Sequence, residues 1–204
     1  MSKVLILGNS NHINKIDFDR LNDDVITLGV NRIWYKFIPD YFTFSDSIIY
    51  NELMEKKMFS KLNNSKIILN DWMIRQRNKH ERYMYKKIKA HDNVLSYKTL
   101  THMPFPDSVC SGLFAYHKFI NKNSDVTYYI AGVDLKYDEN KNHFWTGEYT
   151  NKNKLTKEWY EPRFKRMWQN WLILKDHKLK IISVNPKSEL NKLFPYKNIN
   201  ILYK

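Results

Sequence analysis

The stretch VLILGNSNHI, residues 4–13, joins an apolar run to a polar turn near the start of the chain. Val4–Leu7 is short and continuously apolar, which is typical of a strand buried on both faces of a parallel sheet. Gly8, Asn9 and Ser10 follow it directly, and these residue types favour a tight turn. In open α/β sheets, ligands bind outside the carboxyl ends of the strands. The stretch therefore predicts a first strand whose end faces a binding site.

The rest of the chain alternates short apolar runs with segments of helical character, which indicates an α/β domain with a mostly parallel sheet. Further strands are predicted at 24–30, 41–45, 66–69, 126–131 and 179–184. Helices are predicted at 47–60, 72–90, 111–121 and 162–175, and a short helix or turn at 13–21. Pro162 is expected in the first turn of the last helix. A chain of 204 residues fits a single domain, here expected over 1–204.

Polar turns recur where the predicted strands end. They are GNS at 8–10, VNR at 30–32, SDS at 45–47, AGVD at 131–134 and SVNP at 183–186. These are also ordinary turn residues, but a shared pocket accounts better for the whole set. The first turn has one glycine where a dinucleotide fingerprint needs three, and the chain has no Walker motif. Such a turn can still offer backbone N–H groups and an amide to a phosphate or ribose.

The charge is strongly basic, with 34 Lys and Arg against 21 Asp and Glu and a formal net charge of +13. One interpretation is a solvated, lysine-rich surface. The other is a polyanionic partner: nucleic acid, a phosphorylated donor or an anionic membrane face. The density is highest near 75–89, where Trp72, Tyr83 and Tyr85 are interleaved. The predicted DNA-contacting residues are Arg75, Arg77, Lys79, Arg82, Lys86 and Lys87, with Arg163 in a second cluster.

Cys110 is the only cysteine, which excludes an intramolecular disulfide and a cysteine zinc cluster. A reducing, cytoplasmic setting in a bacterium or a phage-infected cell is expected. No apolar run approaches the roughly 20 residues of a membrane span, and no signal peptide is recognisable. A soluble or peripheral protein is therefore expected, and the oligomeric state is open.

Five segments in order carry a resemblance to a known family: KVLILGNSNHINKIDFDRL, VNR, CSGLFAYHKFI, YYIAGVDLKY and KLKIISVNPKSEL. The set resembles the bacterial sialyltransferases of glycosyltransferase family 42. The resemblance implies a modified-Rossmann (GT-A-like) fold that binds a nucleotide sugar, with a small lid at about 136–160. The family's lid is longer and its C-terminal membrane-associating tail has no counterpart here, so the donor sugar and the acceptor stay open.

The strand-end turns and the resemblance together give the candidate donor-binding residues: Gly8, Asn9, Ser10, Asn31, Asp46, Ser111, Gly112, Gly132, Asp134 and Tyr137. The resemblance implies that Ser111 and Gly112 bind the donor from a helix start, and that Tyr137 touches the phosphate. It also places His143, in the segment KNHFW, where the family's lid carries a catalytic histidine.

Sugar transfer needs a general base for the acceptor hydroxyl and stabilisation of the departing phosphate. A histidine near its usual pKa suits the first role. His143 is the predicted base of an inverting transfer, with an exposed loop histidine as the alternative and His12 and His102 as substitutes. No Asp-x-Asp pair follows an apolar strand, so we expect no essential metal and no cofactor beyond the nucleotide-sugar donor.

The sequence thus favours a nucleotide-sugar-dependent glycosyltransferase, with modified DNA as the leading acceptor, as in phage DNA modification. One alternative is a sialyltransferase-like enzyme that acts on a bacterial surface glycan. Another is a module that binds nucleotide or nucleic acid without catalysis.

Overall fold

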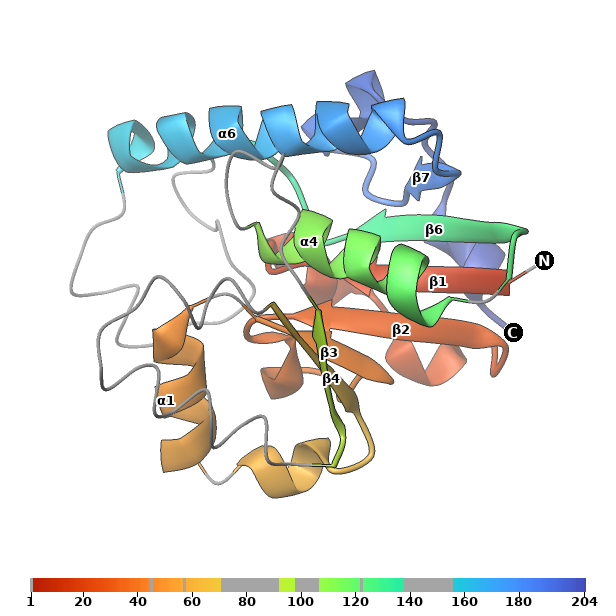
Figure 1. The fold of residues 1–204 in the computed structure, drawn as a ribbon. Coiled ribbons are helices and arrows are strands. Elements are labelled where there is room, and N and C mark those ends of the chain that lie inside the picture. Colours follow the sequence, from red (N-terminus) through yellow and green to blue (C-terminus); the bar gives the residue numbers. More distant parts are fainter. Residues whose placement is uncertain are drawn as a thin grey trace.

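The protein is built around one parallel β-sheet (Figure 1). The computed structural model describes residues 2–44, 46–56, 58–70, 92–97, 107–121, 123–137 and 156–204. Within these ranges, seven strands pair in the order β5-β4-β3-β2-β1-β6-β7, and every pair is parallel. The strands are β1 (Ser2–Leu7), β2 (Val25–Val30), β3 (Tyr41–Thr43), β4 (Lys66–Asn70), β5 (Val94–Tyr97), β6 (Val126–Ala131) and β7 (Ile181–Ser183).

The strand order reverses at β1. The chain adds β2 to β5 on one side of β1, then returns to place β6 and β7 on the other side. In such sheets the loops after the two strands at the reversal diverge and leave a crevice at the carboxyl edge, where ligands bind. In this sheet the reversal lies between β1 and β6, so a ligand is expected at the carboxyl edge around the turns that follow these strands.

Helices cover both faces of the sheet. The longer ones are α1 (Ser47–Glu55), α4 (Ser108–Ala115), which continues as the π-helix η5 (Tyr116–Ile120), and α6 (Lys157–Asp176). The 3-10 helices are η1 (Asn11–Lys15), η2 (Phe18–Arg20), η3 (Ile33–Tyr35), η4 (Met58–Leu62), η6 (Glu189–Lys192) and η7 (Ile199–Leu202). The helices α4 and α6 pack on one face, and α1 packs on the other with η1 and η3.

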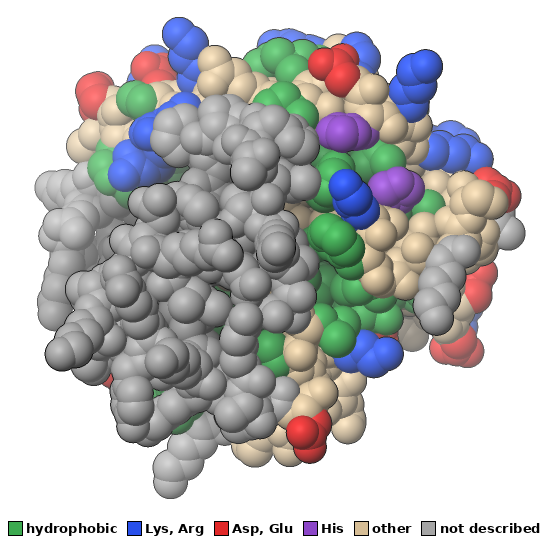
Figure 2. All heavy atoms as spheres, in the orientation of Figure 1, with side chains coloured by type: hydrophobic (Ala, Val, Ile, Leu, Met, Phe, Trp, Pro, Cys, Tyr) green, Lys and Arg blue, Asp and Glu red, His purple; other side chains and the backbone are tan. Residues whose placement is uncertain are grey.

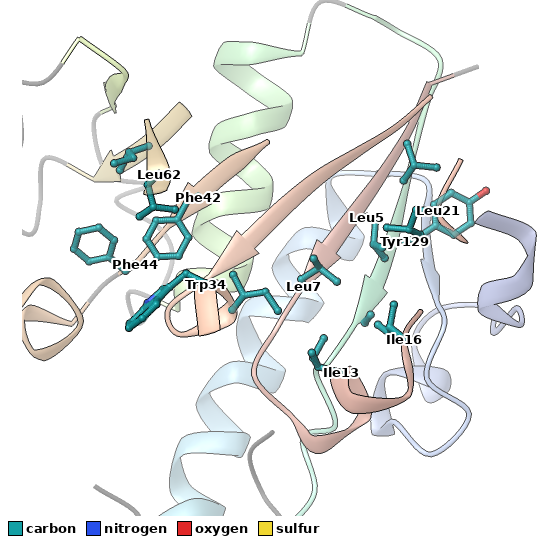
Figure 3. Close-up of a cluster of buried hydrophobic side chains, with 14 of the residues drawn as sticks. Leu5, Leu7, Ile13, Ile16, Leu21, Trp34, Phe42, Phe44, Leu62 and Tyr129 are labelled. Carbon is teal, nitrogen blue, oxygen red and sulfur yellow. The ribbon is translucent and has the colours of Figure 1, made fainter. Parts of the chain in front are cut away.

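The alternation of side chains along β1 builds both cores. Leu5 and Leu7 point into the cluster on the α1 face, shown in Figure 3 with Ile13, Trp34 and Phe42. Val4 and Ile6 point into the cluster under α4 and α6. All four β1 side chains are fully buried, as expected for a central strand of a parallel sheet.

The turns after β1 and β6 touch through their backbones. A Cβ atom at Gly8 would lie 2.3 Å from the carbonyl oxygen of Gly132, which excludes any side chain there. Gly132 itself has φ of +68°, in the left-handed region that favours glycine. The amide N–H of Ser10 donates to the carbonyl oxygen of Gly132 at 2.8 Å. The two turns at the reversal are therefore locked together before any side chain takes part.

The predicted fold class is confirmed, and six of the seven strands lie where the apolar runs predicted them. The short β5 was not predicted. The segment at 13–21 forms η1 and η2, and the helix predicted at 47–60 divides into α1 and η4. The helix predicted at 72–90 lies outside the described residues. So does most of the predicted lid, while Lys157–Tyr160 at its end form the start of α6.

Two predicted helix starts are wrong. The helix predicted from Ser111 begins at Ser108, because Asp107 accepts a hydrogen bond from the amide of Val109 at 2.8 Å and acts as the N-cap. The helix predicted from Pro162 begins at Lys157, so that proline lies inside α6 instead of in its first turn. Pro162 is exposed, so the carbonyl group that its missing N–H leaves without a helical partner can meet water.

Replacing Gly8 by alanine should strongly destabilise the fold. The new Cβ would meet the carbonyl oxygen of Gly132 at 2.3 Å, and we expect a loss of about 2 kcal/mol or more in the free energy of unfolding. Denaturant unfolding of the purified variant measures this loss. Lys197→Ala, at an exposed side chain, is the control and should stay within about 0.5 kcal/mol of the parent. Equal stability of Gly8→Ala and the parent chain would contradict the close contact.

Candidate donor site at the carboxyl edge

One hydrogen-bond network joins the turns after β1, β6 and β7. The hydroxyl of Ser10 donates to Oδ1 of Asp134 at 2.7 Å, and the Nδ2 group of Asn185 donates to the same oxygen. Asn185 is only 3% exposed. The hydroxyl of Ser188 donates to the carbonyl oxygen of Val133 at 2.5 Å. The network fixes the carboxylate of Asp134 beside the first turn.

A second network joins the turn after β1 to β2 and α4. Oδ1 of Asn9 accepts a hydrogen bond from the backbone N–H of Arg32 at 3.3 Å. Asn31 has φ of +52°, a left-handed conformation that asparagine tolerates better than most residues. Its Oδ1 accepts from the hydroxyl of Ser108 at 3.0 Å, and its backbone N–H donates to Thr43 at 2.9 Å.

The two asparagines therefore present the same chemistry to the carboxyl edge. The side-chain oxygens of Asn9 and Asn31 both accept hydrogen bonds from the protein. The remaining polar group of each side chain is its NH2, which can only donate. Two amide donors on neighbouring strand ends suit a ligand that carries acceptor oxygens, such as a phosphate or carboxylate.

The start of α4 reaches the second network through Ser108, the first residue of the helix. Burial raises the pKa of the Asp107 carboxyl group, against the opposing effect of hydrogen bonds from Val109, Cys110 and Asn170. Burial also raises the pKa of the Cys110 thiol well above its usual value, and Asp107 adds to this shift. A protonated, fully buried thiol is unreactive, so this cysteine is a packing residue.

Ser111 and Gly112 do not lie at the helix start. The hydroxyl of Ser111 donates back to the carbonyl oxygen of Asp107 at 2.6 Å, inside the helix. A Cβ at Gly112 would lie 2.6 Å from the side chain of Thr43, so this glycine allows α4 to approach β3. The position predicted for them at the start of the helix is taken by Asp107 and Ser108.

His12 lies in η1, immediately after the first turn. Its backbone N–H is directed at the hydroxyl oxygen of Ser10, 3.4 Å away, as the cap of η1. Burial, with a smaller contribution from Lys15, lowers the pKa of His12 to about 4. Its Nδ1 atom is buried and has no hydrogen-bond partner in the described part of the chain. The imidazole is therefore neutral at neutral pH and a weaker base than an exposed histidine.

Three further predicted residues lie apart from these networks. The ring of Tyr137 packs on Tyr160 of α6, with ring centroids 5.6 Å apart. The guanidinium of Arg163 lies 3.4 Å from the ring centre of Trp159. Figure 2 shows Lys and Arg side chains over these N-terminal turns of α6, at the upper left. Asp46 is exposed just before α1 and makes no side-chain cap hydrogen bond to described residues.

Several predicted residues lie outside the described part of the chain, so their roles stay predictions. They are the proposed base His143, its substitute His102, and the basic residues Arg75, Arg77, Lys79, Arg82, Lys86 and Lys87. Among the described residues, no three His, Cys, Asp or Glu side chains are grouped to hold a metal ion. None of the described helices combines the length and apolar character needed to cross a bilayer.

Several residues of the two networks were not predicted as site residues: Arg32, Glu52, Ser108, Asn185 and Ser188. Ser108 was missed because the helix start was placed too late, although an aspartate just before a helix is a usual N-cap signal. Arg32 is 7% exposed, and its guanidinium binds both carboxylate oxygens of Glu52 in α1. No local pattern joins two residues twenty positions apart on different elements, so sequence reasoning had no signal for this pair.

No protein-family model and no curated protein matches the chain. Solved structures do. The sialyltransferase CstII from Campylobacter jejuni, in complex with the substrate analogue CMP-3FNeuAc, matches with a TM-score of 0.57 at 15% identity, over 100% of this chain and 89% of that one. The monofunctional α-2,3-sialyltransferase Cst-I from Campylobacter jejuni matches with a TM-score of 0.54 at 15% identity, over 100% and 82%.

A further structure of CST-II, in complex with a trisaccharide acceptor and CMP, matches with a TM-score of 0.56 at 14% identity, over 97% of this chain and 87% of that one. Identities this low establish similarity of fold. The chain therefore shares the single α/β sheet domain of these enzymes, which agrees with the modified-Rossmann fold implied by the family resemblance.

The low pKa of His12 predicts a pH dependence of stability. Between about pH 4 and pH 6.5 the unfolded chain binds a proton at this position that the folded chain does not. The free energy of unfolding should therefore fall as the pH drops through this window, by at most about 1.4 kcal/mol per pH unit from this group. His12→Gln should flatten this part of the profile, measured by denaturant unfolding between pH 4 and 8. The same slope in parent and variant would show that His12 is not the group responsible.

Proposed function

We propose that the chain is a glycosyltransferase that moves a sugar from a nucleotide-sugar donor to an acceptor hydroxyl group. The observation that carries the proposal is the pair of amide donors from Asn9 and Asn31, at the carboxyl ends of the neighbouring strands β1 and β2. Supporting it, structures of similar fold are recorded with CMP and with CMP-3FNeuAc. A CMP-linked sugar is therefore the donor that we propose.

The chemistry fits neutral hydrogen-bond donors. As the bond between sugar and phosphate breaks, negative charge grows on the departing phosphate oxygens. Amide N–H groups that are already held in place stabilise this charge without reorganising. The carboxylate of Asp134 accepts a hydrogen bond from Ser10 and lies on the side of the first turn opposite the two amide donors. There it is suited to accept a hydrogen bond from a ribose hydroxyl or a base N–H group, instead of facing the phosphate.

The attacking hydroxyl must lose a proton to a general base. A pKa of about 4 makes His12 a poor proton acceptor at neutral pH. This favours His143 as the base, as the family resemblance implies. Because the described donors are neutral amides, we also propose that the transfer does not require a metal ion.

We propose a saccharide hydroxyl as the acceptor, because the similar CST-II structure is recorded with a trisaccharide acceptor. DNA is a second candidate, favoured by the net charge of +13 and by the basic cluster at 75–87. Purified protein with CMP-sialic acid and either a trisaccharide or hydroxymethylated DNA tests the choice. Product on the saccharide alone supports our proposal. Product on the DNA alone replaces the acceptor but keeps the transferase, whereas consumption of no nucleotide sugar from a broad panel contradicts both.

Removing the amide donors should selectively weaken the binding of anions. Asn9→Asp and Asn31→Asp keep the size and the acceptor oxygen of each side chain but replace NH2 with a charged oxygen. The affinity for CMP should fall about tenfold or more, on the order of 1.4 kcal/mol, whereas the affinity for uncharged cytidine should change little. Calorimetric titration of both ligands measures the difference. Asn198→Asp, at the exposed cap of η7, is the matched control and should bind both like the parent chain.

Loss of the base should affect turnover more than donor binding. His143→Ala should lower kcat for sugar transfer by roughly 10²–10⁴-fold and leave the Kd for CMP nearly unchanged. Activity should also survive excess EDTA. Steady-state assays with and without chelator measure both effects. A variant within a few-fold of the parent would assign the role to another group, and loss with EDTA that manganese restores would establish a metal requirement.

A further inference from the structure

We propose that the largely buried ion pair between Arg32 and Glu52 positions both amide donors of the site. Nε of Arg32 donates to Oε2 of Glu52 at 2.8 Å, and Nη2 donates to Oε1. The side chains are 8% and 19% exposed. The two residues are positioning residues, because they act through Asn9 and Asn31. This inference rests on the proposed function for its ligand, but the geometry that carries it does not.

Stability alone is a weak reason for such a pair. Removing two charges from water is unfavourable, and well-packed apolar residues often replace a buried ion pair without loss of stability. A two-pronged pair of a planar guanidinium and a carboxylate does, however, fix orientation strictly. Its most direct effect is to hold the backbone of Arg32 against α1.

The backbone of Arg32 is what the site uses. Its N–H group donates to Oδ1 of Asn9. With the oxygen held in this way, the NH2 group of Asn9 is directed away from Arg32. The preceding residue is Asn31, in its left-handed conformation. The carbonyl oxygen of Arg32 accepts from Tyr35 at 3.0 Å, which continues the turn into η3. Holding Arg32 in place therefore sets the direction of both amides.

The other end of the pair is anchored in the core. Glu52 lies in α1, and its neighbours Ile49 and Leu53 are buried to within 1% in the cluster around Leu5 and Leu7. The helix follows directly on the carboxyl end of β3. The anchored carboxylate of Glu52 therefore holds the turn after β2 in one position. The short loop could not hold that position by itself.

A different role for Arg32 predicts the opposite change in nucleotide affinity when Glu52 loses its charge. An arginine next to a donor-binding asparagine could itself bind phosphate, with Glu52 as a competitor for its guanidinium. Removing the negative charge of Glu52 would then release Arg32 and tighten the binding of a nucleotide. If the pair positions the amides, the same change weakens binding.

The test compares Glu52→Gln with Asp40→Asn. Asp40 accepts hydrogen bonds from the amide and the hydroxyl of Thr27, at 2.8 and 2.7 Å, within β2 and away from the turn that follows it. Both variants remove one negative charge and one hydrogen-bond acceptor, but only Glu52 is linked to the site. The Kd for CMP should rise about tenfold or more in Glu52→Gln and stay within twofold of the parent in Asp40→Asn. Unchanged or tighter binding by Glu52→Gln overturns the proposal.

A second measurement needs no nucleotide. Amide hydrogen exchange of Arg32, whose N–H is bound to Asn9, should be at least tenfold faster in Glu52→Gln and unchanged in Asp40→Asn. This measurement tests the positioning role separately from the proposed function. If the parent chain binds no nucleotide, the proposed function is contradicted, but the exchange rates still show whether Glu52 positions the backbone of Arg32. Equal exchange in the parent and Glu52→Gln overturns the positioning role.

A double variant separates positioning from stability. Arg32→Met with Glu52→Leu replaces the pair with apolar side chains of similar volume, and should recover most of the melting temperature that Glu52→Gln loses. It should nevertheless retain the weak CMP binding and fast exchange of Arg32. Recovery of affinity together with melting temperature would show that the pair acts only on stability, and would overturn the proposal.

Discussion

The backbone contact between Gly8 and Gly132 is the constraint on which the carboxyl edge depends. The strand order reverses between β1 and β6, and the two turns at that point approach so closely that Gly8 has no room for a Cβ atom. The bond from the amide of Ser10 to the carbonyl oxygen of Gly132 then fixes their register. Asn9 and Ser10, which follow Gly8 directly, are placed by this contact.

From this contact the site divides into two halves. Ser10 turns toward Asp134 and Asn185 and joins the ends of β6 and β7. Asn9 turns toward Arg32 and joins the end of β2. Two adjacent residues therefore contact the turns on opposite sides of β1. One side presents a fixed carboxylate, and the other presents amide donors, which suits a ligand with a polar ring or ribose at one end and an anionic group at the other.

In the half that holds Asn9 and Asn31, the proposed binding of a donor depends on orientation instead of charge. The buried arginine of this half is neutralised by Glu52, and the groups left for the ligand are neutral amides. Neutral donors stabilise a developing charge well only if they are held in place beforehand. The ion pair and the bond to Ser108 hold them in that way.

The features that the sequence predicted well are those with local periodicity. Val4–Leu7 indicated a strand buried on both faces, and the polar turns after the apolar runs indicated the edge where Asn9, Ser10, Asn31 and Asp134 lie. Errors arose where one residue changed a boundary. Asp107 caps α4 before the predicted start, and Pro162 lies inside α6 because the helix begins at Lys157. The short strand β5 was missed because it follows a strongly charged segment, and the charge pattern of that segment concealed the strand.

The sequence by itself determined the α/β class, the positions of six of the seven strands that the structure describes and the polar character of the strand ends, because each of these is encoded in neighbouring residues. Only the tertiary structure decided which polar residues meet. Ser10 and Asp134 are 124 positions apart, and Arg32 and Glu52 are 20 apart on different elements. Such pairs follow from the order of strands in the sheet and from how closely two turns can approach. Those are properties of the packed chain, because parallel strands bring distant turns to one edge whatever their separation in sequence.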